Sequence, residues 1–362
     1  MHRSIIVSAA LFGAFLIPAL VAPAALMPAE ASAQDMNLAL SRYRIAAEDP
    51  AVNPSTPCTT DGGSRAWCAD NDAWTRAMTQ FGGSMLPPVL TPAGTRGVRG
   101  IYVGFESWIT GIENDPSTAT GDAWFRGVEG DGMMAGTPGR SRFVDSVLAW
   151  GRFNVRKGLP FGFELGTSVG YLANTGYWTL GLEVRWALFE GFRDDVGWVP
   201  DFAVRGAVQT LIGDGEFNIT VPSVDLILSE PFIVANSVEI IPSITGQFAW
   251  IFADSELVDL DPGVSTFDTC NPDPSLRDPE VPTPERPPYC RSDGMQLNHN
   301  VVFPSLRSFR ARLGAGLQIR YEWFTLLGAF QFDVLPPGET DSAVPIDMPR
   351  QWTASVGAGL SL

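Results

Sequence analysis

The stretch 176-GYWTLGLEVRWALFEG-191 decides the fold, because apolar and polar residues alternate along nearly its whole length. Every even position from Trp178 to Leu188 is apolar, whereas the odd positions include Glu183 and Arg185. A period of two places successive side chains on opposite faces of a β-strand, so the stretch predicts a strand with one apolar face. Soluble strands usually run about five or six residues, which raises the question of what covers so long an apolar face.

The same alternation recurs along the chain and predicts about ten strands, within a range of roughly eight to twelve. The expected strands span residues 98–110, 142–155, 161–171, 177–188, 200–212, 217–228, 238–253, 305–320, 323–334 and 351–362. The strand at 217–228 is less regular than the others and contains Pro222. After residue 33, no apolar run approaches the roughly 20 residues that a membrane helix needs.

The connections between these strands differ in length according to the side on which they fall. If the strands alternate in direction, the three longest loops, 111–141, 254–304 and 335–350, all lie on one side. The tight turns at 156–160 and 321–322 lie on the other side. Long outer loops, short periplasmic turns and aromatic residues near both strand ends are typical of transmembrane β-barrels. The apolar face of the opening stretch is then expected to face lipid.

Residues 97–362 therefore resemble bacterial outer-membrane β-barrel proteins as a class, although no single family is matched. The C-terminal QWTASVGAGLSL resembles the terminal assembly signal of that class, with Leu362 in place of the usual Phe. The resemblance implies an all-β fold, a transmembrane antiparallel up-and-down barrel, set in outer-membrane lipid and inserted by the barrel-assembly machinery. The alternative is a secreted soluble sandwich or lipocalin-like barrel. Long strands and glycine-rich polar faces argue against it. The oligomeric state stays open.

The first residues predict the compartment. His2 and Arg3 precede a long apolar run, and the small residues Ala-Ser-Ala at 31–33 precede Gln34. This is the pattern of a secretory signal peptide over 1–33. A membrane anchor is the alternative, but the run contains three prolines. The expected location is the bacterial outer membrane, after cleavage of the signal peptide.

Residues 34–96 precede the predicted barrel and form a separate segment. Its DNDAWTRAMTQFGGSML places Trp74, Met78, Phe81 and Met85 at helical spacing. The segment loosely resembles the N-terminal plug of the outer-membrane fatty-acid transporter family, of which it matches no motif. We expect a segment with a short helix that plugs the lumen; the alternatives are a periplasmic cap or a loop stapled by Cys58–Cys68.

Four cysteines, Cys58, Cys68, Cys270 and Cys290, lie in two segments rich in Pro, Gly and Asp. Outside the cytoplasm this favours two local disulfides, Cys58–Cys68 and Cys270–Cys290, among three pairings that four cysteines allow. A zinc site is the alternative. The chain has no CxxC, and His299 is its only histidine after residue 33, so we expect no metal and no cofactor.

The formal charge is −16. A protein that binds nucleic acid needs a basic surface, and an acidic chain therefore excludes nucleic acid as a partner. The acidic loop 254–304 lacks the spacing of a calcium-binding EF-hand loop and is expected to be a solvated surface loop.

Charged residues on the polar strand faces are expected to point into the lumen. They are Arg99, Arg142, Arg152, Glu164, Glu183, Arg185, Asp201, Arg205, Glu239, Arg310, Arg312, Arg320 and Asp333. Both signs occur, so we expect ion pairs. An eight-stranded barrel is filled by its own side chains, and one of about ten strands is only slightly wider. A wide aqueous pore is therefore not expected.

The function predicted from these features is a narrow or plugged channel or transporter for small solutes. The alternative is a non-conducting structural barrel that displays long acidic loops for adhesion or surface recognition. Enzymatic activity is not expected. Enzymes on barrels of this size, such as omptin proteases and outer-membrane phospholipases, need a histidine with a partner, and only His299 is available.

Overall fold

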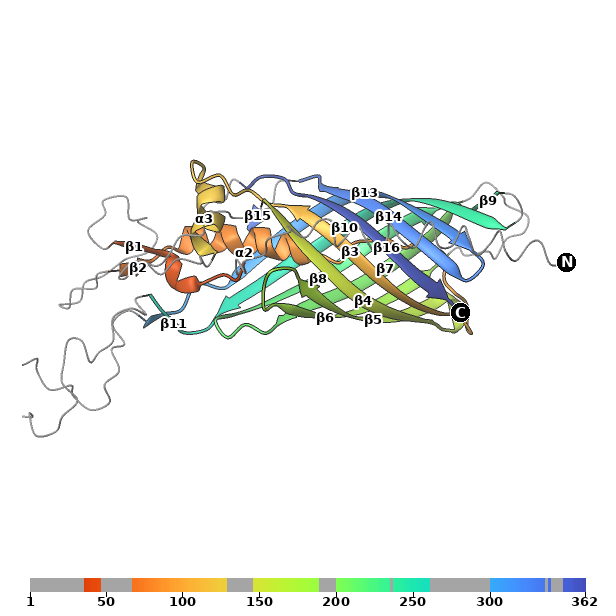
Figure 1. The fold of residues 1–362 in the computed structure, drawn as a ribbon, viewed down its shortest axis with the longest axis horizontal. Coiled ribbons are helices and arrows are strands. Elements are labelled where there is room, and N and C mark those ends of the chain that lie inside the picture. The colour runs from red at the N-terminus through yellow and green to blue at the C-terminus, as the bar shows by residue number, and fades with distance from the viewer. Residues whose placement is uncertain are drawn as a thin grey trace, which may run out of the picture.

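The barrel consists of ten long strands (Figure 1). The computed structural model describes residues 36–46, 67–128, 146–188, 200–234, 237–260, 300–335, 338–339 and 348–362. The barrel strands are β3 (Ile101–Gly111), β4 (Val147–Gly158), β5 (Phe163–Leu172), β6 (Trp178–Ala187), β7 (Asp201–Ile212), β8 (Phe217–Ser229), β10 (Val238–Ser255), β13 (Leu306–Tyr321), β14 (Phe324–Asp333) and β16 (Trp352–Ser361).

The sheet closes on itself, and neighbouring strands are antiparallel throughout. β10 pairs with β13, and the last strand, β16, pairs with the first, β3, from Ser361–Tyr102 to Thr353–Thr110. A closed barrel has no free edge on which another chain could pair. The prediction of an all-β, antiparallel barrel of about ten strands is confirmed.

Short strands extend the barrel at both ends. β9 (Phe232–Val234) pairs with β10, and β15 (Gly338–Glu339) pairs with β13. Two small sheets are formed by β1 (Arg44–Ala46) with β2 (Trp67–Ala69), and by β11 (Val258–Asp259) with β12 (Asn300–Val301).

We call the two ends of the barrel the loop end and the turn end. β3 begins at the turn end and finishes at the loop end, where α3 (Ala119–Gly127) interrupts the expected polar loop. At the turn end, β4 and β5 are joined by a 3-10 turn, Pro160–Gly162. A Cβ on Gly162 would lie 2.6 Å from the carbonyl oxygen of Ala187, and its φ is +75°, so only glycine fits this turn.

The side chains of the strands alternate between the two faces of the wall as the sequence predicts. On β6, Leu182 is 64% exposed on the outer face, whereas Arg185 is 3% exposed on the inner face. β8 differs, because its inner face changes character along its length. Phe217, Ile219 and Val221 are buried apolar residues, and Asp225 is a buried carboxylate.

The irregular pattern of β8 has a physical cause in the helix α2 (Asn71–Met85), which packs against the apolar part of its inner face. The helix starts at Asp70, whose side chain accepts a hydrogen bond from the N–H of Ala73 at 3.0 Å. It ends before Pro87 and Pro88, which cannot continue a helix. Nearly all of its residues are buried, as expected of a helix surrounded by a wall. No helix of the described residues is long and apolar enough to cross a membrane.

Residues 36–46 and 67–70, which we call the N-terminal cap, lie at the loop end. The N–H of Met36 donates to the carbonyl of Asn174 at 2.7 Å, and the N–H of Ala39 to that of Gly127 at 2.9 Å. Both acceptors belong to connections of the loop end. The cap therefore lies at the end of the barrel opposite to the short turns, and α2 enters the lumen from that end.

The lumen as the candidate functional site

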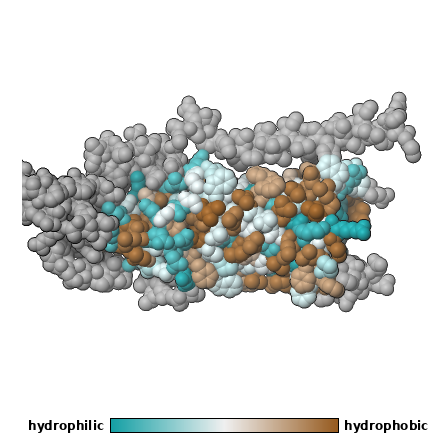
Figure 2. Space-filling view, turned by 90° about the horizontal axis from the view of Figure 1, so that it is seen from below, coloured by the Kyte–Doolittle hydropathy of each residue, from teal (hydrophilic) through white to brown (hydrophobic). Residues whose placement is uncertain are grey.

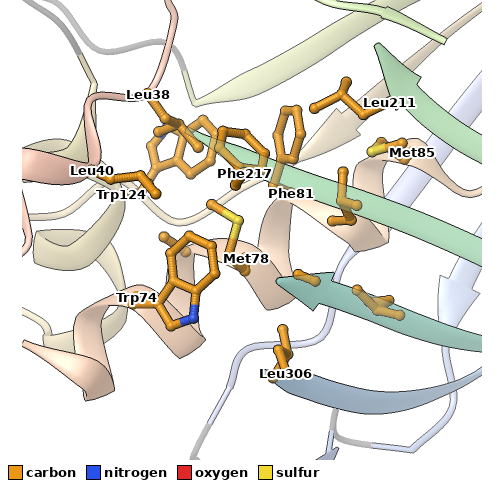
Figure 3. Packing of buried hydrophobic residues seen from close by; sticks show 14 of the residues in the cluster. Leu38, Leu40, Trp74, Met78, Phe81, Met85, Trp124, Leu211, Phe217 and Leu306 are labelled. Atoms are coloured by element: carbon orange, nitrogen blue, oxygen red, sulfur yellow. The ribbon is translucent and has the colours of Figure 1, made fainter. Parts of the chain in front are cut away.

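The loop-end half of the lumen is an apolar core built around α2. Phe81 lies at its centre, with its ring 5.6 Å from that of Tyr177 and 6.0 Å from that of Phe217. The rings of Trp150 and Trp124 lie 6.1 and 6.3 Å from it. Figure 3 shows Phe81 of α2 beside Phe217 of β8, with Trp124 of α3 in the same cluster. This half of the lumen is packed like a protein interior.

The wall also fixes the helix by hydrogen bonds to its backbone. The indole N–H of Trp108 donates to the carbonyl of Ser84 at 2.9 Å, and that of Trp150 donates to the hydroxyl of Ser84 at 3.2 Å. The helix lies so close to the wall that a Cβ on Gly82 would be 2.4 Å from the side chain of Ile251. The two glycines of the helix allow this approach.

A first ionic cluster lies beside the helix. Asp333 accepts from Arg310 at 2.6 Å and from Arg312 at 2.8 Å. Arg310 also donates to the carbonyl of Thr79 at 2.7 Å, and the Gln351 amide donates to that of Gln80 at 3.2 Å. The cluster therefore connects β13, β14 and the chain before β16 to the helix backbone.

Beyond α2 the chain continues through the lumen as an extended, proline-rich segment. The carbonyl of Pro87 accepts from Arg205 at 3.0 Å and from Gln247 at 3.1 Å. The carbonyl of Pro88 accepts from Arg205 at 3.3 Å and from Arg152 at 3.5 Å. Buried carbonyls of an extended chain need donors from outside it, and three different strands supply them.

The arginines of this region form a neutral belt with three carboxylates. We define the arginine belt as Arg152, Arg156, Arg205, Glu106, Glu183 and Asp225. Arg205 lies 2.6 Å from Asp225 and 3.4 Å from Glu183, and Arg156 lies 2.9 Å from Glu106. Five of the six side chains are at most 3% exposed, and Glu183 is 14% exposed. Arg156 and Arg205 each contact two carboxylates and Arg152 contacts Glu106, and this pairing compensates for much of the loss of water. A void of only about 10 Å³ accompanies the belt.

The segment leaves the lumen at the turn end. Arg185 donates to the carbonyl of Pro92 at 3.1 Å and also contacts the hydroxyl of Thr91. The N–H of Ala93 donates to the Ser229 hydroxyl at 2.9 Å, and Arg96 contacts the hydroxyl of Ser361. Residues 71–96, which we call the lumen segment, therefore run from the loop end to the turn end. A cavity of about 240 Å³ remains beside their last residues.

Most of the charged residues predicted to face the lumen lie along this path. Arg152, Glu164, Glu183, Arg185, Arg205, Arg310, Arg312 and Asp333 lie inside the wall, and Asp201, Glu239 and Arg320 line the turn-end cavity. Arg99 requires a correction. It is exposed in the turn before β3, because the strand begins only at Ile101. Arg142 lies outside the described residues.

Sequence reasoning missed Glu106, Arg156 and Asp225. Glu106 lies at an even position of the first strand. The even positions of that strand face inward, because the apolar outward residues such as Phe105 are odd, so the alternation could have identified it. Arg156 was assigned to a turn, although β4 continues to Gly158. Asp225 lies on the strand whose pattern is irregular.

Of the four cysteines, one lies within the described residues. Cys68 is buried in β2 and disulfide-bonded, whereas Cys58, Cys270, Cys290 and His299 lie outside the described residues, so the pairing stays a prediction. Within the described part of the chain, no group of His, Cys, Asp and Glu is arranged to hold a metal ion.

The outer face of the barrel is apolar between two aromatic zones. Near the loop end, the rings of Tyr171 and Trp178 lie 4.9 Å apart. Near the turn end, those of Phe163 and Trp186 are stacked at 5.5 Å. Exposed Leu, Val, Ile and Phe side chains lie between them, and Figure 2 shows apolar surface over much of the described wall. An apolar band flanked by aromatic girdles matches the two interfaces of a lipid bilayer.

The fold is that of an outer-membrane β-barrel. No protein-family model matches the chain, and no curated protein matches it. Solved structures to which it is similar include the attachment invasion locus protein Ail of Yersinia pestis, with 9% identity and a TM-score of 0.24, over 73% of this chain and 99% of that one. The N-terminal β-barrel domain of Pseudomonas aeruginosa OprF has 11% identity and a TM-score of 0.24, over 72% and 97%. The β domain of the Bordetella autotransporter Brka has 11% identity and a TM-score of 0.32, over 73% and 99%. Similarities this low say nothing about activity.

Proposed function

We propose that this protein is a closed, plugged barrel of the bacterial outer membrane that holds its N-terminal cap on the cell surface. The observation that supports this proposal is the lumen segment, which occupies the barrel from one end to the other. It is bound by an apolar core in one half and by arginines in the other. The function then lies at the loop end and not in solute flow through the lumen.

The energetics of the plug support a permanently closed barrel. Withdrawing α2 would expose Trp74, Met78, Phe81 and Met85, each fully buried. At about 1.5–3 kcal/mol for each side chain, the apolar cost alone is roughly 6–12 kcal/mol. A cost of about 6 kcal/mol makes the open state at least about four orders of magnitude rarer than the closed state. Spontaneous opening is therefore negligible.

The direction of the chain supports surface display. The predicted signal peptide delivers the chain to the periplasm, and in barrels of this class the long loops face outward. The cap contacts connections at the same end as those loops, since the N–H of Leu40 donates to the Glu216 carboxylate at 2.8 Å, in the short connection between β7 and β8. Surface display then requires the cap, residues 36–46 and 67–70, to reach the outer side through the lumen of the barrel that the same chain builds.

Epitope accessibility on intact cells tests the display. A tag inserted after Gln34 is expected to bind antibody without permeabilisation. The same tag inserted in the turn between Tyr321 and Phe324, at the turn end, serves as the matched control and is expected to bind only after permeabilisation. The opposite pattern would exclude a surface cap.

Planar-bilayer recording tests the closed lumen. The full chain is expected to give no steady conductance, and an open porin recorded in the same bilayers shows whether the assay detects a conducting barrel. Steady conductance of the full chain would exclude a permanent plug. It would favour the second candidate function, passage of small solutes, for which the turn-end cavity is the supporting observation.

A further inference from the structure

The seam between the last and the first strand of the barrel passes close to the exit of the lumen segment. At the turn end, β16 pairs with β3 up to Ser361–Tyr102. Beyond this pair, Ile101 and Leu362 each donate their N–H to the carbonyl of the other, at 2.9 and 2.8 Å. Arg96, the last residue of the lumen segment, contacts the hydroxyl of Ser361. The exit of the segment and the turn end of the seam are therefore in contact.

The seam has few side chains of its own at this end. Gly104 of β3 and Gly359 of β16 face each other across it, both on the inner face of the wall. A glycine inside a strand weakens the strand, because it has no side chain to pack. The ring of Tyr102 covers both glycines. A Cβ on Gly104 would lie 2.3 Å from the Tyr102 hydroxyl, and a Cβ on Gly359 would lie 2.5 Å from two ring carbons. An aromatic ring over strand glycines supplies the packing that they lack.

The lumen segment contacts this ring from two positions. Tyr102 is fully buried, and Leu90 packs with it and with Leu327 of β14 in one cluster. The guanidinium carbon of Arg96 lies 4.9 Å from the ring centroid, and that of Arg156 lies 5.1 Å from it. A cation within about 6 Å of an aromatic face is attracted to it, more strongly where water is excluded. The ring is thus held between the lumen segment and the wall.

Arg96 contacts both strands of the seam, β3 through Tyr102 and β16 through Ser361. The Ser361 hydroxyl also forms a hydrogen bond with that of Thr325 on β14, at 3.0 Å. We propose that Leu90 and Arg96 hold the turn end of the seam closed through the ring of Tyr102. The lumen segment then stabilises the closure of the wall in addition to filling its interior. This role does not depend on surface display of the cap.

Hydrogen exchange of the backbone amides of the purified full chain in detergent tests the proposal. Amides of the β16–β3 pairing are compared with those of the β5–β6 pairing, which the same local opening would not expose. Arg96→Gln is expected to speed exchange near Ser361 about tenfold, the loss of one desolvated cation–π contact, and to leave β5–β6 unchanged. Arg99→Gln is the same change in the exposed turn before β3. It is the matched control and is expected to exchange like the wild type.

Substitutions at Tyr102 test the ring itself. Tyr102→Phe keeps the ring and removes a hydroxyl that has no hydrogen-bond partner, so it is expected to exchange like the wild type. Tyr102→Leu uncovers the glycines and is expected to speed exchange at the seam more than Arg96→Gln does. Gly359→Ala displaces the ring and is expected to act at the seam as well. Gly328→Ala on β14, where a Cβ meets no atom within 4 Å, is its control.

The comparison of the two strand pairings separates a seam contact from general support of the fold. If Arg96→Gln speeds exchange equally at β16–β3 and at β5–β6, the contact stabilises the whole barrel and the proposal is overturned. Unchanged exchange at the seam in that variant would overturn it as well. Neither outcome alters what epitope accessibility shows about the cap. The heat-modifiable migration of each variant on gels shows that it has folded.

Discussion

The two halves of the lumen are lined by the same strands, yet their inner faces are opposite in character. At the loop end, β3 and β4 present Trp108 and Trp150, stacked at 6.0 Å. A few residues further toward the turn end, the same strands present Glu106 and Arg152, joined by a 2.7 Å hydrogen bond. The change in the wall coincides with a change in the lumen segment from helix to extended chain.

The difference shows how the backbone of a buried segment determines what must surround it. A helix satisfies its own N–H and C=O groups, so α2 presents side chains and the wall around it can be apolar. The extended segment has no N–H at Pro87 or Pro88 and offers the carbonyls of these residues no partner of its own, so they accept from the wall. The wall therefore supplies guanidinium groups, and these require carboxylates to balance them. The arginine belt follows from the prolines.

The largest effect is expected from damage to the apolar half. Phe81→Ala leaves a cavity among four aromatic rings and is expected to lower the free energy of unfolding by about 3–5 kcal/mol. Urea unfolding in detergent, followed by tryptophan fluorescence, measures it. The same substitution at Phe161, which is 86% exposed in the turn before β5, is the control and is expected to have little effect. Equal effects at the two sites would mean that α2 is not part of the core.

The next largest effect is expected from a charge on the outer face of the wall, at the level of the arginine belt along the barrel axis. Leu182 lies beside Glu183 in sequence but points to lipid, so Leu182→Arg is expected to cost about 2–4 kcal/mol near the bilayer midplane. Gly206→Val is the control, since a Cβ at Gly206 meets no atom within 4 Å and Val is apolar. Unfolding from lipid vesicles measures both. A tolerated arginine at 182 would show that inner and outer faces are exchanged.

A smaller effect is expected in the charged half. Asp225→Asn removes one charge from Arg205, which keeps Glu183 at 3.4 Å and an Asn acceptor, so we expect a loss of about 2 kcal/mol. The matched control is Asp254→Asn at the exposed pair with Arg307, 3.5 Å apart, where about 1 kcal/mol or less is expected. Urea unfolding of both variants compares them. Indistinguishable losses would contradict the assignment of the belt as a buried network.

The smallest effect concerns the cap and depends on pH. Burial raises the pKa of the Glu216 carboxyl, and the nearby Asp214 adds to the rise, although the N–H of Leu40 opposes it. Because the folded-state pKa lies above the unfolded value, ionisation of Glu216 costs the folded state free energy. The contribution of Glu216 to the free energy of unfolding is therefore most favourable at low pH, and it is lost as the pH rises through the raised pKa of the folded state.

Glu216→Gln is expected to remove this dependence. Thermal unfolding of both proteins from about pH 4 to about pH 8 measures it, with the variant relatively more stable at the upper end. If the wild type instead became more stable than the variant as the pH rises, the pKa of Glu216 in the folded protein would be lowered and not raised.

Much of the wall could be predicted from the sequence, because lipid imposes a period of two on every strand. Trp178, Leu182 and Trp186 lie outward as their parity indicates. The strand at 217–228 was unclear for a physical reason. Phe217 and Ile219 point inward to meet a helix, while Asn218 and Thr220 take the outward positions, so the apolar residues of that part of β8 lie on the opposite face from those of the rest of the strand.

The contents of the lumen could be predicted only in part. The helical spacing of Trp74, Met78 and Phe81 indicated a helix, but the interactions that follow it depend on backbone carbonyls. No side-chain pattern marks Pro87 and Pro88 as acceptors for Arg205, which follows them by more than a hundred residues. The turn-end cavity likewise arises from strands far apart in the sequence.

The pairing of β16 with β3 has a consequence for the order of assembly. These strands are the last and the first of the barrel, so the final seam joins residues at opposite ends of its sequence. Contacts of such high sequence separation form slowly. The helix inside lies so close to the wall at Gly82 that even a Cβ there would clash with Ile251. We therefore expect the seam to close around a helix that is already in position, so that α2 and the barrel wall assemble together.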